Sequence, residues 1–298
     1  MYNIYILYNI YILYTTYNKI NGIKIELQND KMEKNITFST CWYLLNAKFD
    51  ANVYSKWIDN MISCVNNYYL VIYTDERGVS FLKERFSKHL ENPNIKTIIK
   101  PMESFYNYKY KENWIRNHPN NPYLNTRTEW KLHMLWAEKT HFVNETANNK
   151  YYDTEFYGWC DIGYFRDFPI PEFPSNDKIM ALNKNKVYYG IVNNNSEYMN
   201  ELYRIIQDKN EVGLPKMEIP PTQTSVAAGF FISHKTKIQW WKNTFDSKLE
   251  LYFKHNYLVK DDQIIVIDCI FSDIKQFQLV RESTPYLDIW FLFQRYLL

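Results

Sequence analysis

Asp161 is the first candidate for chemistry in this chain of 298 residues. It closes an aromatic segment, FYGWC (156–160), and is followed by Gly163 and Arg166. The segment has the composition of a buried strand, and an unpaired carboxylate at a buried position is costly or shifts its pKa. A turn in which local amides satisfy Asp161 is the ordinary explanation. The alternative is a ligand site, because open α/β sheets bind ligands outside the carboxyl ends of their strands.

The shortage of glycine excludes most other ways of binding a phosphate. The chain has only seven glycines, and no GxGxxG fingerprint can be built from them. Gly158 and Gly163 have P-loop spacing, but Tyr164 and Phe165 follow where Lys and Ser or Thr are required. No GxSxG or HExxH motif is present either. What remains is a divalent metal, which needs one or two carboxylates plus substrate phosphates and water, and Asp161 meets that requirement.

Composition and charge exclude several classes of protein. Hydrophobic residues make up 46% of the chain and aromatic residues 18%, which is typical of a globular protein. The formal net charge of +2 and the lack of a basic stripe give no reason to expect a nucleic-acid partner. The four cysteines form no CxxC or Cys/His cluster, so neither structural zinc nor a disulfide framework is expected. A reducing compartment fits best, and we expect a cytoplasmic location.

The first residues stand apart from the rest of the sequence. MYNIYILYNIYILY (1–14) contains YNIYIL twice, and its apolar run is half of the ~20 residues that a membrane span needs. It also lacks the positive region and the cleavage site of a signal peptide. We therefore expect residues 1–34 to be a low-complexity leader outside the core. Membrane contact is expected at most through residues 2–14, and the body of the protein is expected to be soluble.

From residue 35 onward the sequence alternates between strand and helix patterns. Apolar or alternating segments predict strands at 36–45, 69–73, 95–99, 156–160, 187–192 and 225–233. Helical spacing predicts helices at 54–65, 79–90, 126–147, 197–207 and 238–253, and another helix that begins at the acidic pair 261–262. Strands joined by helices in this way favour a parallel sheet with crossover helices. We expect one α/β domain over residues 35–298, with a mostly parallel central sheet flanked by helices.

Four stretches of the sequence resemble the HtrL/YibB-like proteins, a family of presumed glycosyltransferases of GT-A fold. In chain order they are WKLHMLWAEKTHFV (130–143), GWCDIGYFR (158–166), AAGFFIS (227–233) and DDQ (261–263). The resemblance spans residues 37–271. It implies a GT-A-like fold, that of nucleotide-diphospho-sugar transferases, for residues 35–298.

The resemblance gives Asp161 the role of a metal ligand. In GT-A enzymes an acidic pair at the end of a central strand binds Mn²⁺ or Mg²⁺, which bridges the diphosphate of the sugar nucleotide. Here Gly163 stands in place of the second carboxylate, as it does in the HtrL/YibB-like proteins. GT-A folds usually also offer a late histidine, but no histidine follows His255. Either another group substitutes for it, or the metal is weakly held or absent.

The acidic pair at residues 261–262 is the predicted source of a catalytic base. A positioned carboxylate can take the proton of an acceptor hydroxyl if the enzyme inverts configuration. The resemblance favours Asp262 for this role, with Asp261 as the second choice. In a retaining enzyme Asp262 would orient the sugar instead. Two acids in a first helical turn also favour the helix dipole, so a purely structural role stays open.

Further residues are predicted to contact the nucleotide sugar. Lys131 and Arg166 are candidates to balance the charge of the leaving diphosphate, although a solvated helix charge and a strand-end salt bridge explain them equally well. The ends of the first two strands are expected near the nucleotide, although TDE (74–76) could also form a polar strand cap. The complete predicted binding set is Thr40, Trp42, Asp75, Lys131, Trp159, Gly163, Arg166 and Gly229.

Together these features predict a metal-assisted glycosyltransferase. It would move a sugar from a UDP- or GDP-linked donor to a hydroxyl group of a glycan, polysaccharide or glycoprotein. The missing second carboxylate and late histidine favour an alternative, a catalytically silent nucleotide- or sugar-binding module with the same fold. An unrelated α/β nucleotide enzyme such as a methyltransferase is a third reading, against which the glycine shortage argues.

Overall fold

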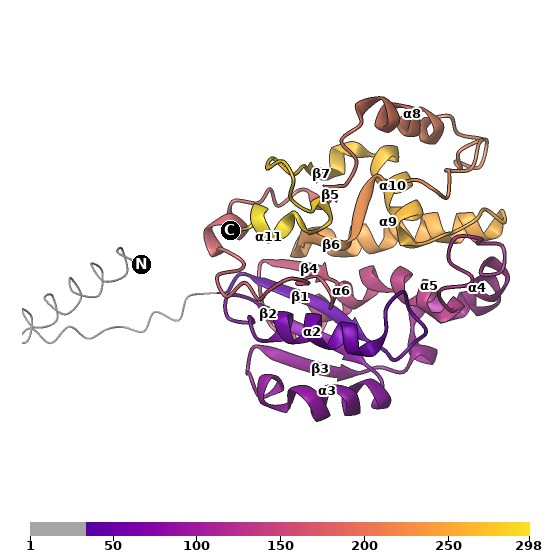
Figure 1. The fold of residues 1–298 in the computed structure, drawn as a ribbon. Coiled ribbons are helices and arrows are strands. Elements are labelled where there is room, and N and C mark those ends of the chain that lie inside the picture. The colour runs from indigo at the N-terminus through magenta and orange to yellow at the C-terminus, as the bar shows by residue number, and fades with distance from the viewer. Residues whose placement is uncertain (1–33) are drawn as a thin grey trace, which may run out of the picture. The chain divides into compact units, whose positions relative to one another are not determined.

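The central element of the computed structural model, which describes residues 34–298, is one sheet of seven strands. The strands are β1 (Ile36–Trp42), β2 (Tyr69–Thr74), β3 (Ile95–Ile99), β4 (Phe156–Cys160), β5 (Val187–Ile191), β6 (Val226–His234) and β7 (Phe277–Val280). Their order is β3-β2-β1-β4-β6-β5-β7, with β3 and β7 at the two edges (Figure 1). Strand β6 runs antiparallel to both neighbours, and the other four pairs are parallel. The prediction of an α/β fold with a mostly parallel central sheet is confirmed.

Side chains alternate along each strand, so they point to both faces of the sheet. A hydrophobic cluster covers each face. In β2, Val71 and Tyr73 join one hydrophobic cluster, and Leu70 and Ile72 join the other. The first cluster is completed by α4 (Lys111–Asn117), α5 (Trp130–Ala137), α6 (Lys139–Asn148), α8 (Ser196–Gln207), α9 (Lys235–Lys254) and α10 (Asp262–Ser272). The second is completed by α2 (Ala51–Ile62), α3 (Glu76–Leu90), α7 (Asn176–Met180) and α11 (Phe293–Tyr296). Short 3₁₀ helices lie at Met102–Ser104, Tyr106–Tyr110, Ile274–Gln276 and Ile289–Phe291.

Two helices begin where the sequence supplies a capping carboxylate. Asp50 accepts hydrogen bonds from the backbone N–H groups of Asn52 at 2.8 Å and Val53 at 3.1 Å, at the start of α2. Asp75 accepts from the backbone N–H of Gly78 at 2.7 Å, at the start of α3. Such caps satisfy donors that the first helical turn leaves unpaired. Helices α2 and α3 therefore begin at defined points after β1 and β2.

Some predicted elements have different bounds in the structure. The predicted helix 126–147 is two helices, α5 and α6, separated at Glu138. The buried Glu138 carboxylate accepts hydrogen bonds from the backbone N–H groups of Tyr106 at 2.9 Å and Asn107 at 3.1 Å, a long-range contact that local spacing does not reveal. The first strand ends at Trp42 rather than at residue 45. The C-terminal segment, for which the sequence patterns predicted no strand or helix, contains β7 and α11.

The carboxyl ends of β1 and β4 lie side by side, because these strands are parallel and Ser39 is paired with Trp159. The loops after both strands therefore leave the sheet at the same edge. Strand β6 approaches this edge from the opposite direction, and the backbone O of Gly229 accepts a hydrogen bond from the Asp161 N–H at 2.8 Å. Three segments that are distant in the sequence thus meet beside Asp161.

Two predictions concern residues that the structure does not describe. The predicted leader lies outside the described residues, apart from Lys34, and so does the predicted membrane contact at residues 2–14. Residues 34–298 form one compact unit. Among them, no helix is both long enough and apolar enough to cross a membrane.

Candidate functional site

A cavity of about 460 Å³ opens at the edge of the sheet where β1 and β4 end. Its lining comes from the end of β1 and the loop after it, from α2, α5 and α6, from the end of β4 and the loop after it, from β6 and from the start of α10. Asp288, Trp290 and Phe291, near the C-terminus, complete it. Small-molecule sites in proteins commonly measure roughly 300–1,000 Å³. The cavity is therefore large enough for a small-molecule substrate.

All four stretches that carry the family resemblance contribute to this one cavity. Their lining residues, in chain order, are Leu132, Leu135, Trp136, Lys139, Trp159, Asp161, Ile162, Gly163, Tyr164, Arg166, Ala227, Ala228, Gly229, Asp261, Asp262 and Gln263. The stretches lie far apart in the sequence and on different elements, so only the fold brings them together. Their convergence connects the resemblance to a single site.

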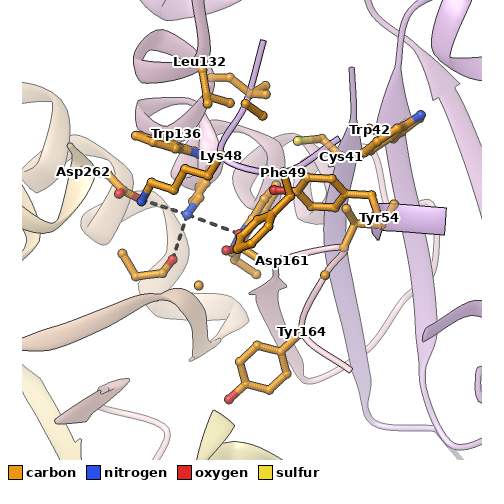
Figure 2. A pocket seen from close by; sticks show the side chains of 18 of the residues that line it. Cys41, Trp42, Lys48, Phe49, Tyr54, Leu132, Trp136, Asp161, Tyr164 and Asp262 are labelled. Carbon is orange, nitrogen blue, oxygen red and sulfur yellow. Dashed lines mark hydrogen bonds and ion pairs between the residues drawn. The ribbon is translucent and has the colours of Figure 1, made fainter. Parts of the chain in front are cut away.

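Lys139 lies at the centre of the polar groups in the cavity, and it had no role in the sequence predictions. Its Nζ is 3.0 Å from Asp262 Oδ2 and 3.3 Å from Asp161 Oδ1, and it donates a hydrogen bond to the backbone O of Ala228 at 3.0 Å (dashed lines in Figure 2). The side chain is only 9% exposed. Burial alone would lower the pKa of Lys139, but the two carboxylates raise it well above its ordinary value. The lysine therefore remains a cation.

Asp161 faces the cavity, as the ligand-site explanation requires. Its side chain is 44% exposed, and its Oδ1 accepts a hydrogen bond from Trp159 Nε1 at 2.6 Å. A turn is also present, since the Tyr164 N–H donates to the Asp161 backbone O, but the carboxylate itself is not held by local amides. Gly229 leaves room for it, because a Cβ at that position would lie 2.9 Å from Asp161 Oδ2. Trp159 and Gly229 thus lie directly against the carboxylate.

The acidic pair at the start of α10 also turns toward the cavity. Asp261 is the N-cap residue, yet its side chain makes no capping hydrogen bond. Its Oδ2 is 3.1 Å from Lys260 Nζ, and its buried Oδ1 has no hydrogen-bond partner within residues 34–298. Burial raises the pKa of Asp262 to about 6, with Lys139 opposing the shift and Asp261 adding to it. Asp262 is therefore suited to exchange a proton near neutral pH.

Two further cations line the cavity without a carboxylate partner. No ion pair within residues 34–298 involves Lys48 or Arg166. Lys48 Nζ lies 5.1 Å from the centre of the Trp136 ring, and in Figure 2 its side chain extends toward Asp262. The Arg166 guanidinium lies 4.5 Å from the centre of the Trp57 ring. Both cations are available to an anionic ligand.

Trp42 and Gly163, from the predicted binding set, also line the cavity. Trp42 is the last residue of β1, and its ring packs against Tyr54 of α2 with the ring centres 5.3 Å apart. A Cβ at Gly163 would lie 2.9 Å from the Trp57 ring, so a glycine lets the loop after β4 pack directly on α2. The roles of Trp42 and Gly163 toward a ligand stay predictions.

Three members of the predicted binding set do not line the cavity: Thr40, Asp75 and Lys131. Thr40 is fully buried within β1. Asp75 caps α3, which is the structural explanation that the sequence left open. Lys131 lies one position before Leu132, and a single helical step turns a side chain away from the face that lines the cavity. We therefore leave these three residues out of the proposed site.

Helical spacing carries a signal that could have identified Lys139. Leu132, Leu135, Trp136 and Lys139 stand at positions i, i+3, i+4 and i+7, which share one face of a helix. All four line the cavity. A lysine that continues an apolar stripe is notable, because lysine is almost never fully buried unless it is paired. Lys48, in the loop after β1, has no comparable signal in the sequence.

The donor set of the cavity does not fit the predicted divalent metal. Mg²⁺ and Mn²⁺ need several oxygen ligands around a free cation position. Here Asp161 and Asp262 already direct carboxylate oxygens at the ammonium of Lys139. Among the side chains of residues 34–298, no group of three or more His, Cys, Asp and Glu could hold a metal ion. The metal at Asp161 stays a prediction of the family resemblance.

Comparisons with known proteins leave the family open. No family model and no curated protein matches the chain, so nothing here supports the narrower HtrL/YibB-like family. Similar solved structures include mouse xyloside xylosyltransferase 1 in its apo form, at 11% identity, over 82% of this chain and 85% of that chain, with a TM-score of 0.46. They also include core-mannan synthase A from Aspergillus fumigatus in its Mn/GDP form, at 10% identity, over 85% of this chain and 74% of that chain, with a TM-score of 0.46. At this level of similarity, the function has to be argued from the site itself.

Proposed function

We propose that this protein is a glycosyltransferase that moves a sugar from a nucleotide-sugar donor to a hydroxyl group of a glycan, polysaccharide or glycoprotein. The observation that carries the proposal is the convergence of all four motif stretches on one cavity. This cavity lies at the carboxyl ends of parallel strands, where open α/β sheets bind ligands. The resemblance supplies the reaction class, and the cavity supplies a site of suitable size and chemistry.

The diphosphate of the donor is expected to pair with Lys48 and Arg166. Within residues 34–298, these two cations line the cavity without a carboxylate partner. Departure of a nucleoside diphosphate develops negative charge, which fixed cations stabilise in the transition state. Trp42, Tyr54 and Trp136 add aromatic faces, on which a base or a sugar ring can stack. Both UDP- and GDP-sugars match this description.

Asp262 is the proposed base of an inverting transfer. Its carboxylate takes the proton of the acceptor hydroxyl, whose oxygen forms the new bond to the anomeric carbon of the sugar. The bond from that carbon to the diphosphate breaks, and its electron pair leaves with the nucleoside diphosphate. A base with a pKa of about 6 is mostly ionised at neutral pH and still accepts a proton. Asp261 is the second choice, and in a retaining reaction Asp262 would orient the sugar.

A divalent metal, which the family resemblance implies, would neutralise charge on the diphosphate when bound. The only residue that the resemblance assigns to it is Asp161. The steps above use only residues of this chain and do not require the metal. Asp161 and Asp262 are already paired with Lys139.

Donor turnover tests the proposal directly. A panel of UDP- and GDP-sugars is assayed for hydrolysis and transfer, with and without Mn²⁺, and at least one donor should be consumed. Asp262→Asn should abolish most of that turnover. Asp208→Asn is the matched control, because Asp208 pairs with Lys216 on the exposed surface, and it should keep full turnover. Absence of both turnover and nucleotide binding across the whole panel would contradict the proposal.

A catalytically silent nucleotide- or sugar-binding module is the second candidate. It is favoured by the observation that Asp161 and Asp262 both contact Lys139, since an ion-paired carboxylate accepts a proton less readily. This candidate predicts nucleotide-sugar binding that Asp161→Asn leaves unchanged, with no transfer to any acceptor. Calorimetric binding measurements combined with an acceptor screen separate the two candidates.

A further inference from the structure

The ammonium of Lys139 is held by three oxygen atoms from three elements of the fold. Asp161 follows β4, Asp262 begins α10 and Ala228 belongs to β6, and their oxygens lie 3.3, 3.0 and 3.0 Å from Nζ. A lysine ammonium has three hydrogen-bond donors and no acceptor. Each donor therefore has an oxygen partner, and the three oxygens surround one positive charge.

A divalent cation at this position would compete with Lys139 for the oxygen atoms that face the ammonium. Mg²⁺ and Mn²⁺ prefer carboxylate and carbonyl oxygens, and proteins usually supply one or two carboxylates to Mg²⁺. Asp161 and Asp262 are the two carboxylates in contact with Lys139. A metal ion bound to the same oxygens would be repelled by the ammonium beside it. Only one of the two cations can occupy this position.

We propose that Lys139 is the resident cation of this site, and that the protein binds its nucleotide donor without a divalent metal. The ammonium holds Asp161 and Asp262 in place and supplies the positive charge at the position where the family resemblance expects a metal ion. For the identity of the donor, this inference rests on the proposed glycosyltransferase function. For the occupant of the cation position, it rests on the geometry around Nζ alone.

Two observations indicate that the ammonium does not give way to a metal ion. Lys139 and Asp262 have side chains that are 9% and 8% exposed, so their contact is shielded from water. Asp161 Oδ1, the oxygen nearest to Lys139, also accepts the Trp159 Nε1–H at 2.6 Å. That oxygen is therefore engaged by two donors, and a metal ion that bound to it would have to displace one of them.

Mn²⁺ binding measured by electron paramagnetic resonance tests the proposal without any substrate. The wild-type protein is titrated with Mn²⁺ alone, and no binding that depends on Asp161 is expected. Lys139→Ala leaves two carboxylates and a carbonyl around an emptied position, so it should gain about tenfold or more in Mn²⁺ affinity over wild type. Adding Asp161→Asn to Lys139→Ala should remove this gain.

Lys100→Ala is the matched control for the loss of a lysine. Lys100 Nζ pairs with Glu145 Oε2 at 2.5 Å, and neither residue lines the cavity. The Lys100→Ala protein should show the same Mn²⁺ titration as wild type. A gain in Mn²⁺ affinity equal to that of Lys139→Ala would overturn the proposal, because it would show that the gain does not come from this site.

Nucleotide binding forms the second arm of the experiment. Calorimetric titration of the wild-type protein with UDP and with GDP, in Mn²⁺ and in EDTA, should give affinities that agree within about twofold. An affinity about tenfold or more higher in Mn²⁺ would overturn the proposal. So would Mn²⁺ binding by the wild-type protein that Asp161→Asn removes.

The two arms separate this proposal from the proposed function. If neither nucleotide binds in either condition, the glycosyltransferase function fails, and the Mn²⁺ titration still decides the role of Lys139. If circular dichroism shows that Lys139→Ala is unfolded, the wild-type titration decides by itself, since Asp161-dependent Mn²⁺ binding overturns the proposal and its absence supports it.

Discussion

Helix α10 carries two buried aspartates with opposite surroundings, and Asp268 is the one that is fully enclosed. Its Oδ1 lies 2.5 Å from Lys209 Nζ and 3.2 Å from Lys248 Nζ, and its Oδ2 accepts a hydrogen bond from the Tyr252 hydroxyl at 2.9 Å. The side chain is 0% exposed and does not line the cavity. One carboxylate therefore meets two cations and a hydroxyl, and links α10 to α9 and to the segment just after α8.

Asp262, at the first position of the same helix, does not have two cations of its own but shares one with another carboxylate. It shares the single cation Lys139 with Asp161, and Asp261 lies next to it in the chain. All of these residues line the cavity. Asp161 and Asp262 share the one cation that both contact, while Asp261 contacts Lys260, and burial raises the pKa of Asp262 to about 6.

The comparison shows that ion pairing by itself does not separate a structural aspartate such as Asp268 from the proposed catalytic one, Asp262. A buried carboxylate surrounded by donors is a link between elements, and removing one partner leaves an uncompensated charge. A carboxylate that shares its cation at the wall of a cavity has a shifted pKa, which is the pattern of catalytic groups. Four substitutions or titrations test this difference, and they are ordered by the size of the expected effect.

Asp262→Asn should have the largest effect, and the effect should be on catalysis. Removing a general base is expected to lower kcat by about 10²- to 10⁴-fold, while the amide keeps nearly the same volume. Steady-state kinetics on the donor identified in the panel measures the loss, and thermal unfolding reports the fold. Turnover within a few-fold of wild type would remove Asp262 from the mechanism and weaken the comparison.

Asp268→Ala should act on stability instead. It leaves Lys209 and Lys248 without their buried partner, and breaking a buried ion pair in this way is expected to lower the free energy of unfolding by about 3 kcal/mol. Urea denaturation measures the change, and nucleotide affinity below the transition should match wild type. A loss of nucleotide binding at unchanged stability would show that Asp268 belongs to the site as well.

Gly229→Ala should affect the cavity and leave the surroundings of Asp268 unchanged, which sharpens the comparison. The added Cβ would lie 2.9 Å from Asp161 Oδ2, so the carboxylate has to shift from its position beside Lys139. Displacing a positioned group by about 1 Å can lower turnover by about 100-fold, and we expect kcat/KM to fall by about 10- to 100-fold. Kinetics measures this fall, and a wild-type kcat/KM would show that the position of Asp161 does not matter for the reaction.

The pH profile should give the smallest effect. Asp262 acts as a base only when it is ionised, and its pKa of about 6 means that protonation begins just below neutral pH. We expect kcat/KM to be level above pH 7 and to fall by about tenfold at pH 5. The Asp262→Asn protein should lack this acidic limb in its residual activity. A flat wild-type profile between pH 5 and 7 would contradict the assignment.

Local patterns were sufficient for most of the fold. The strands at 95–99 and 156–160 have the predicted bounds, because a short segment rich in β-branched or aromatic residues between polar turns specifies a strand by itself, whether it lies at the sheet edge like β3 or is buried like β4. The long predicted helix was wrong at Glu138, where two backbone N–H groups from residues 106 and 107 bind the carboxylate. The last strand, FQLV (277–280), was not predicted. It is short, and its pairing with β5 is a long-range contact that local patterns do not show.

The candidate site also contains residues that the sequence predicted and a residue that it did not. Motif resemblance predicted site roles for Asp161, Asp262 and Gly229, which all line the cavity, although nothing in the sequence says that they lie close together. It also selected Lys131, which does not line the cavity, and passed over Lys139, which does. Both lysines occur in the same motif stretch, Lys131 on α5 and Lys139 on α6, and the direction of their side chains distinguishes them.

The sequence by itself determined the alternation of strands and helices and the aspartates at their ends, because short-range periodicity and turn chemistry are encoded by neighbouring residues. Only the tertiary structure decided which charges meet. Lys139, Asp161 and Asp262 come from three separate elements, and their contact depends on the packing of α6, β4 and α10 around one edge of the sheet. Electrostatic interactions at about 3 Å depend on side-chain positions in space, and a linear sequence does not contain those positions explicitly.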